Sequence, residues 1–186
     1  MPTLQVSLIR GYSGPVRQRL CRRLTAATTA VLGAAPEAVT VFLHEVDPDG
    51  YARGGHARTP AAAPEQTPEE VVTAFLAAME ARDLETAATH LADGFVMTFP
   101  GSGPMTRLDE LVAWARGRYR FVRKTFEAVD TADHLDHAVV TCHGHLHGEW
   151  PDGTPFEGVR FIDRFEVRHG RLTRQDVWND LALVSP

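Results

Sequence analysis

The sequence of 186 residues is poor in cysteine and lysine and has no long apolar run. No segment approaches the roughly 18 uninterrupted apolar residues that a membrane span needs. The amino terminus also lacks the basic and then apolar layout of a secretory signal. Cys21 and Cys142 are too few for a disulfide framework and are expected to be buried thiols. These absences favour a cytoplasmic protein with no membrane partner.

The basic residues are 18 arginines and one lysine, in a chain of net charge −5. They are interspersed with acidic residues and form no basic stripe of the kind that nucleic-acid binding requires. Nucleic acid is therefore not an expected partner. An apolar fraction of 44% with 23% charged residues is ordinary for a globular protein, and the length allows one domain or two small ones.

The first 55 residues have the pattern of a β-α-β unit. Apolar residues alternate from Leu4 to Leu8 and recur at helical spacing from Val16 to Val31, and residues 39–46 are typical of a second strand. A crossover through one helix makes the two strands parallel. Two strands and one helix bury too little surface to be stable alone, so the unit is expected to pair with copies of itself.

Pro2, this layout and the segment YARGG together resemble the 4-oxalocrotonate tautomerase family. The resemblance implies that Pro2, freed by removal of Met1, is a catalytic general base or acid. It also implies a catalytic role for Arg53. A secondary amine acts as a base near neutral pH only if desolvation and nearby cations lower its pKa, and Arg10 is the other available cation. The resemblance further implies an assembly whose strands form a continuous sheet.

Two positions depart from the pattern of that family. Its founding members have arginines where this chain has Tyr12 and Thr40, which argues against a dicarboxylate substrate. Tyr51 fills the place of an aromatic residue that lines the family's pocket. Arg10, Tyr12 and Tyr51 are therefore expected to bind substrate. The alternative is that Pro2 merely begins an edge strand, where proline is tolerated.

Residues 56–66 contain three consecutive alanines and two prolines without apolar periodicity, and are expected to be a linker. Residues 67–186 then show helix signals followed by strand signals. Thr67, Pro68 and Glu70 form a capping box, and a third helix is expected at 106–118. Four strands are expected at about 125–130, 137–148, 156–167 and 172–183. The expected fold class is α+β, with helices packed in a curved antiparallel sheet around a cavity.

The phrases VVTAFLAAMEARDLETAATHLADGF and FIDRFEVRHGRLTRQDVWNDL resemble the nuclear transport factor 2-like (NTF2-like) superfamily. The similarity is greatest to its SnoaL-like polyketide cyclase and ketosteroid isomerase branches. In ketosteroid isomerases a protonated aspartic acid stabilises an enolate at the position of Asp163. Phe75 and Phe99 stand where those enzymes have the catalytic tyrosine and the general-base aspartate, which argues against steroid isomerisation by that mechanism. These two residues are instead expected to bind substrate.

Asp163 is the only polar member of an alternating strand row that also contains Val159, Phe161, Phe165 and Val167. Its side chain is therefore expected to point into the cavity. A buried carboxyl group is costly unless it is paired or protonated, so Asp163 is a candidate catalytic residue. The alternatives are a salt bridge with an arginine or a hydrogen bond to a buried indole.

His143, His145 and His147 alternate on one strand, at a spacing that metal sites can use. The opposite row of this strand is apolar and should face the core, so a metal site is not expected unless a bulge reverses the rows. No cofactor is expected either. Trp178 and Asn179, near the end of the last strand, are expected to line the mouth of the cavity.

Two functions are consistent with these patterns. The first is a tautomerase or isomerase acting on a small enolisable carbonyl compound, in which the second domain performs or assists a linked cyclisation, isomerisation or elimination. The second is a non-catalytic protein, in which the curved sheet and helices of the second domain bind a hydrophobic ligand and the first domain serves as an oligomerisation module. Both predict a homo-oligomer with a small-molecule partner.

Overall fold

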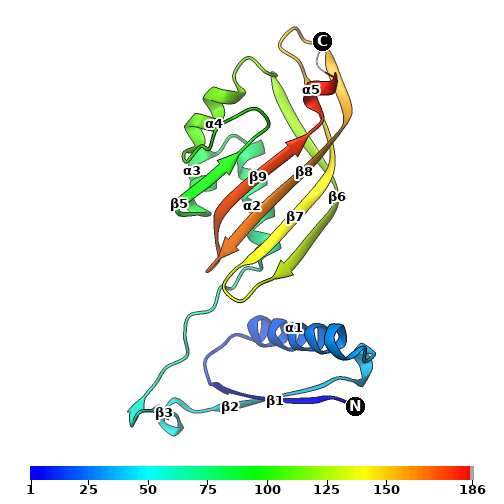
Figure 1. Cartoon of the computed structure of the whole chain (residues 1–186). Coiled ribbons are helices and arrows are strands. Elements are labelled where there is room, and N and C mark those ends of the chain that lie inside the picture. The colour runs from blue at the N-terminus through cyan, green and yellow to red at the C-terminus, as the bar shows by residue number, and fades with distance from the viewer. Residues whose placement is uncertain (185–186) are drawn as a thin grey trace. The chain divides into compact units, whose positions relative to one another are not determined.

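The computed structural model describes residues 1–184, which divide into two compact units (Figure 1). The boundary between them along the chain falls between Glu65 and Gln66. Each unit has its own strands and helices. No helix in the described residues is long and apolar enough to cross a membrane.

The first unit is a β-α-β unit followed by a small hairpin. Strand β1 (Thr3–Ile9) leads through helix α1 (Gly14–Leu32) to strand β2 (Thr40–Val46), with the 3-10 turns η1 (Pro36–Ala38) and η2 (Pro48–Gly50) on either side of β2. The two strands pair in parallel, as their crossover connection predicted. Strands β3 (Ala52–Arg53) and β4 (His56–Ala57) form the hairpin.

Local signals fix both ends of α1. The side chain of Ser13 accepts a hydrogen bond from the Val16 amide at 3.4 Å, and Pro15 occupies the first turn. The helix ends at Gly33, whose φ of 65° is a left-handed conformation that glycine adopts without strain. Capping thus sets the length of the helix that packs on the two strands.

The segment after the hairpin is held against α1. Arg19 donates to the carbonyl oxygen of Glu65 at 3.0 Å and also to that of Pro64, and Ser13 donates to the Glu65 carboxylate at 2.9 Å. Strand β4 also lies within residues 56–66, which the composition assigned to a linker. The first unit therefore extends beyond residue 55.

The first unit has no fully buried residue, although the structure describes all of residues 1–65. Many of its apolar side chains are only partly buried, and Phe42 remains 48% exposed. A domain that buries so little surface is marginally stable by itself. This observation agrees with the expectation that the unit needs a partner.

The second unit contains α2 (Pro68–Glu80), α3 (Leu84–Thr89), β5 (Leu91–Thr98), α4 (Leu108–Ala115), β6 (Phe121–Asp133), β7 (Ala138–Glu149), β8 (Pro155–Arg168), β9 (Arg171–Asn179) and the short α5 (Leu181–Val184). Its sheet has the strand order β5-β9-β8-β7-β6. Strands β6 to β9 are antiparallel neighbours, whereas β5 pairs with β9 in parallel. Figure 1 shows α2 and α4 on the concave side of this sheet.

The helix boundaries follow their capping residues. Thr67 and Glu70 form the expected capping box of α2, with bonds of 3.2 and 2.7 Å. Helix α4 is shorter than the expected range of 106–118 and ends at Ala115, because Arg116 leaves the helical conformation and Gly117 has a φ of 85°. Phe99, which follows β5, packs against Trp114 of α4, with the ring centres 5.3 Å apart.

The core lies between α2 and the sheet. Its fully buried members are contributed by α2, α3, β5, β7, β8 and β9, and include Phe75, Met97, Val140, Phe165 and Leu172. Phe75 contacts the rings of Phe95 and Phe165 edge to face. These contacts hold α2 over the middle of the sheet.

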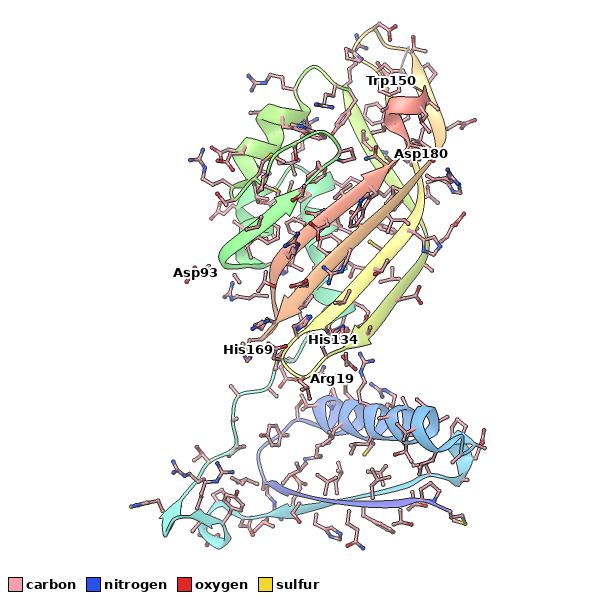
Figure 2. All side chains as sticks on the ribbon, in the orientation of Figure 1. Arg19, Asp93, His134, Trp150, His169 and Asp180 are labelled. Atoms are coloured by element: carbon pink, nitrogen blue, oxygen red, sulfur yellow. The ribbon has the colours of Figure 1, made fainter. Side chains whose placement is uncertain are left out.

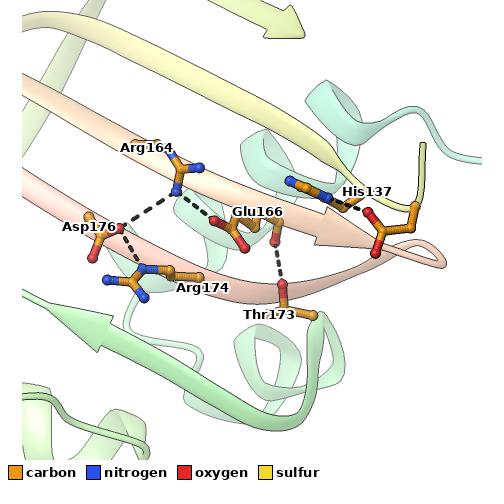
Figure 3. A network of polar contacts seen from close by, with 7 residues as sticks. His137, Arg164, Glu166, Thr173, Arg174 and Asp176 are labelled. Carbon is orange, nitrogen blue, oxygen red and sulfur yellow. Dashed lines mark hydrogen bonds and ion pairs between the residues drawn. The ribbon is translucent and has the colours of Figure 1, made fainter. Parts of the chain in front are cut away.

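The outer face of the sheet carries a network of charged side chains (Figure 3). Arg164 lies 2.8 Å from Glu166 and 3.7 Å from Asp176, and Arg174 binds Asp176 at 2.7 Å. The hydrogen bond that Arg174 donates to Asp176 raises the pKa of Arg174. The charges on this face are therefore paired with one another.

Candidate functional site

The second unit encloses a cavity of about 540 Å³ between α2, α4 and the sheet. Most of its wall is aromatic or aliphatic, and includes Phe75, Phe99, Trp114, Phe126, Phe161 and Leu181. A space of this size accommodates a small organic molecule. Figure 2 shows Asp180, which follows β9, and Trp150 at one end of the sheet, near α5.

The cavity wall contains an ion pair. Lys124 of β6 contacts Oδ2 of Asp163 on β8, and both residues line the cavity. The Asp163 side chain is completely inaccessible to solvent, whereas that of Lys124 is 20% exposed. The lysine therefore stands between the carboxylate and the open space.

Other side chains support this pair. Nε2 of Gln175 donates to Oδ2 of Asp163 at 3.4 Å, and the Lys124 ammonium lies 4.8 Å from the centre of the Phe161 ring. Among the described residues, Oδ1 of Asp163 and Oε1 of Gln175 have no hydrogen-bond partner. A desolvated acceptor without a partner is uncommon in a folded protein and strengthens the attraction for a nearby cation.

A few further polar groups line the cavity. Burial raises the pKa of the Tyr119 phenol, so its hydroxyl stays protonated at neutral pH. Arg123 lies 3.7 Å from Glu80, and both side chains are largely exposed. Asn179 contributes an amide from the end of β9. The cavity thus offers one buried charge pair and several neutral donors.

The positions of the residues expected in the second unit can now be compared with this cavity. Asp163, Phe75, Phe99 and Asn179 all line it. Trp178 does not, which corrects its expected position at the cavity mouth: its side chain is 54% exposed and alternates with the inward-facing Val177 and Asn179. Asp163 pairs with Lys124 and not with an arginine.

The residues expected in the first unit lie in two groups at opposite ends of β1 and β2. The Pro2 carbonyl accepts a hydrogen bond from the Thr40 amide at 3.0 Å, where both strands begin. Arg10 binds Asp47 at 2.6 Å where the strands end, and the hairpin with Arg53 follows. Figure 1 shows the amino terminus and β3 at opposite ends of this unit. Pro2 and these arginines therefore do not meet within one chain.

Tyr12 and Tyr51 belong to the end of the unit that lies away from Pro2. Tyr12 lies between β1 and α1, and its carbonyl accepts a hydrogen bond from Arg17 at 2.9 Å. Tyr51 follows η2 and is 36% exposed. Neither tyrosine can reach Pro2 of the same chain.

The three alternating histidines of β7 lie on the face away from the cavity. The row that includes Val140, Cys142 and Leu146 is the buried one, as its apolar pattern predicted. His145 lies 3.1 Å from Glu127 on the outer face. No group of three or more histidine, cysteine, aspartate or glutamate residues within 1–184 is arranged to hold a metal ion.

Lys124 is the candidate residue that sequence reasoning missed. The expected strand began at Thr125, so Lys124 fell outside it, whereas β6 begins at Phe121. One signal was available, because Lys124 is the single lysine of the chain. Its register partner Leu146 is buried, which places Lys124 on the inner face.

Comparison with protein families agrees with the two units. Residues 2–59 match the model of the tautomerase enzyme family, and residues 72–175 match that of the SnoaL-like domain. The second match spans more than half of the chain.

Solved structures are also similar to parts of this chain. A structure of TerC co-crystallised with polyporic acid is 19% identical, with a TM-score of 0.52, and the match covers 63% of this chain and 95% of that chain. An NTF2-like protein from Burkholderia thailandensis is 22% identical with the same TM-score, over 64% and 95% of the two chains. TomN, a 4-oxalocrotonate tautomerase homologue of the tomaymycin biosynthetic pathway, is 36% identical over 30% of this chain and 86% of that chain, with a TM-score of 0.30. The chain therefore belongs to the SnoaL-like domain family, and carries a tautomerase-family unit fused ahead of that domain.

Proposed function

We propose that the protein is an isomerase-type enzyme that acts on a small enolisable carbonyl compound, with Pro2 as general base and acid. The observation that carries this proposal is an apolar cavity with a buried charge pair, in a chain that also contains a unit matching the tautomerase family. Both features suit a compound that passes through an enol or enolate. The cavity holds the apolar part of the compound, and the charged groups stabilise its oxygen.

The chemistry assigned to Pro2 requires a free secondary amine. Once Met1 is removed, an unprotonated Pro2 nitrogen can take the proton next to the carbonyl group and return it at another carbon or at oxygen. The negative charge that develops on the substrate oxygen needs a nearby cation. Arg53 is the proposed cation, with Arg10, Tyr12 and Tyr51 as substrate contacts.

These groups require a second copy of the chain. Pro2 and Arg10 are separated by the length of β1, about 26 Å at roughly 3.3 Å per residue. A site that joins Pro2 to the arginines can form only where the start of one β1 approaches the end of another. The structure describes every residue of the first unit, and none of them is fully buried. This lack of a buried core supports such a homo-oligomer.

The role proposed for the second unit is a linked step on the same compound. Phe75 and Phe99 would contact its apolar part, and Asn179 its polar groups. Asp163 already accepts from Lys124 and Gln175, so it acts in this proposal as the partner of a cation and not as a hydrogen-bond donor. Cyclisation, further isomerisation and elimination all use this combination of a cation and an enolate.

The proposal is tested with the full-length protein and panels of enol-pyruvates and β-keto acids, followed by ultraviolet absorbance. Intact mass should show that active material has lost Met1, since an amide nitrogen is not a base. Pro2→Ala should lower the rate of proton transfer by about a hundredfold or more. Asp109→Asn, which alters an exposed ion pair with Arg107, is the matched control and should leave the rate unchanged.

Full activity in protein that retains Met1 would contradict the role of Pro2. If no member of either panel is turned over but one binds in the cavity, the protein is instead a binding module whose first unit serves assembly.

A further inference from the structure

The chain uses a lysine at only one position. Its other 18 basic side chains are arginines, and the single lysine is Lys124 in the cavity wall. Arginine stays protonated in proteins and presents a planar donor group, whereas lysine can lose its proton and act as a nucleophile. For holding an anion or pairing with Asp163, an arginine would serve as well. The position is therefore distinguished by what only a primary amine can do.

The surroundings of Lys124 also suit a nucleophilic amine. Its side chain is only 20% exposed, its ammonium lies 4.8 Å from the centre of the Phe161 ring, and its other neighbours on the cavity wall include Phe126 and Leu146. Asp163 contacts the ammonium from the buried side and is inaccessible to solvent. A ligand in the cavity therefore meets the amine before it meets the carboxylate.

We propose that Lys124 forms a covalent imine with the carbonyl carbon of an aldehyde or ketone held in this cavity. The proposal rests on the carbonyl substrate of the proposed function and adds a covalent site to it. Asp163 is the proton acceptor and the counter-ion, and Gln175 holds its carboxylate in place through the bond of 3.4 Å.

The step balances without any other reactant. Asp163 takes one proton from the Lys124 ammonium, and the free amine adds to the carbonyl carbon. A C–N bond forms while the carbonyl π electrons move to oxygen, which takes a proton from the newly bonded nitrogen. Asp163 then returns its proton to the hydroxyl group of this carbinolamine, the C–O bond breaks, water leaves, and a protonated imine remains beside the restored carboxylate.

The sum is one ammonium and one carbonyl group giving one iminium and one water. The positive charge beside Asp163 is thus the same before and after the reaction, so the buried carboxylate has a cationic partner in both the free enzyme and the imine. An iminium withdraws electrons from the neighbouring carbon more strongly than a ketone does. It therefore favours loss of the adjacent proton, which is the step that enol chemistry requires. Hydrolysis returns the free lysine.

The single lysine makes the test unusually direct. The full-length protein is incubated with 4-phenylbutan-2-one and sodium cyanoborohydride, which reduces an imine to a stable amine, and the adduct is located by peptide mass. We expect one adduct on the peptide that contains Lys124. In Lys124→Arg, which keeps the positive charge, the amino-terminal nitrogen is the only aliphatic amine left to trap. That variant should therefore lose the internal adduct and retain any terminal one.

The dependence of imine trapping on Asp163 distinguishes a specific site from non-specific reactivity of the lysine. Asp163→Asn should slow trapping at Lys124 by about a hundredfold, since the proton acceptor is lost. If that variant does not fold, the urea-unfolded parent protein serves as the reference and should be trapped at Lys124 more slowly than the native protein. Trapping at the same rate in native and unfolded protein, or no adduct at Lys124, would overturn the proposal.

The outcome for Lys124 is independent of the outcome for Pro2. Pro2→Ala should abolish isomerase turnover and leave trapping at Lys124 unchanged. Trapping without turnover in the parent protein would reject the proposed function of the first unit alone, whereas turnover without trapping would reject only the imine.

Discussion

Cys142 and Asp163 lie directly opposite each other in the register of β7 and β8. Burial, and then the negative charge of Asp163, raise the pKa of the Cys142 thiol to about 12. A thiol with a raised pKa stays protonated until the pH approaches that value. Cys142 is accordingly a core residue, and it lies beside the candidate site without being a nucleophile in it. Cys21 is only partly buried and not fully buried as expected.

Alkylation can distinguish the two thiols. Native protein treated with iodoacetamide at pH 8 should be modified at Cys21, because the thiolate and not the thiol reacts. Cys142 should become reactive only after unfolding, which peptide mass can measure. Equal modification of both residues in native protein would contradict the raised pKa of Cys142.

The same pKa predicts how stability depends on alkaline pH. The unfolded chain releases the Cys142 proton near its ordinary pKa of 9.0, whereas the folded protein holds it until about pH 12. The unfolded state thus binds fewer protons between these values, so the free energy of unfolding should fall as the pH rises through this window. Urea unfolding of the parent and of Cys142→Ala should show a steeper fall for the parent.

Removing one charge of the buried pair should destabilise the second unit. Asp163→Asn leaves the Lys124 ammonium without its counter-ion and should lower the free energy of unfolding by about 3 kcal/mol. Adding Lys124→Met should recover most of this loss, because no unpaired charge then remains. Thermal melting of the single and double variants measures both effects. A single variant as stable as its parent would show that the pair contributes nothing to folding.

The first unit should govern assembly. The side chain of Phe42 on β2 is 48% exposed, whereas its neighbours Val41 and Leu43 are partly buried. Strands β1 and β2 form a two-stranded sheet, so each of them also has one unpaired edge. Light scattering should find at least a dimer at micromolar concentration, and Phe42→Asp should shift it to smaller species. Leu135→Asp, at the exposed turn between β6 and β7, is the matched control. A strictly monomeric parent would contradict the proposed site between copies.

Gly144 should be sensitive to any side chain, because a Cβ at this position would lie 2.0 Å from the carbonyl oxygen of Thr125. Gly144→Ala must push β6 away from β7 and should lower the free energy of unfolding by about 1–3 kcal/mol. The control is Gly103→Ala, which meets nothing within 4 Å and should change it by less than about 0.5 kcal/mol. Urea unfolding followed by circular dichroism compares the two.

The alternation of β8 was sufficient to place Asp163 in the cavity. Val159, Phe161, Phe165 and Val167 are buried beside it, because a strand sends every second side chain to the same face. Lys124 escaped the same argument because it lies in a polar run of β6, between Arg123 and Thr125. In such a run the inward position is revealed only by the neighbouring strand.

The end of β9 shows a second limit of sequence patterns. The apolar residues up to Leu183 favoured a longer strand, but β9 ends at Asn179. The Asp180 amide donates to the Arg160 carbonyl at 3.1 Å, and the chain then turns into α5. The boundary is set by this backbone bond to a neighbouring strand together with the side chain of Asn179, which accepts a hydrogen bond from the Leu181 amide at 3.2 Å.

The parallel pairing of β5 with β9 has a consequence for synthesis on the ribosome. Residues 91–98 emerge early, yet the strand they pair with is the last of the sheet to be made. The contacts within β1, α1 and β2 are local by comparison, and local contacts form fastest. We therefore expect the helix and strands of the first unit to fold while the ribosome is still translating, and the cavity to close only after β9 has been synthesised.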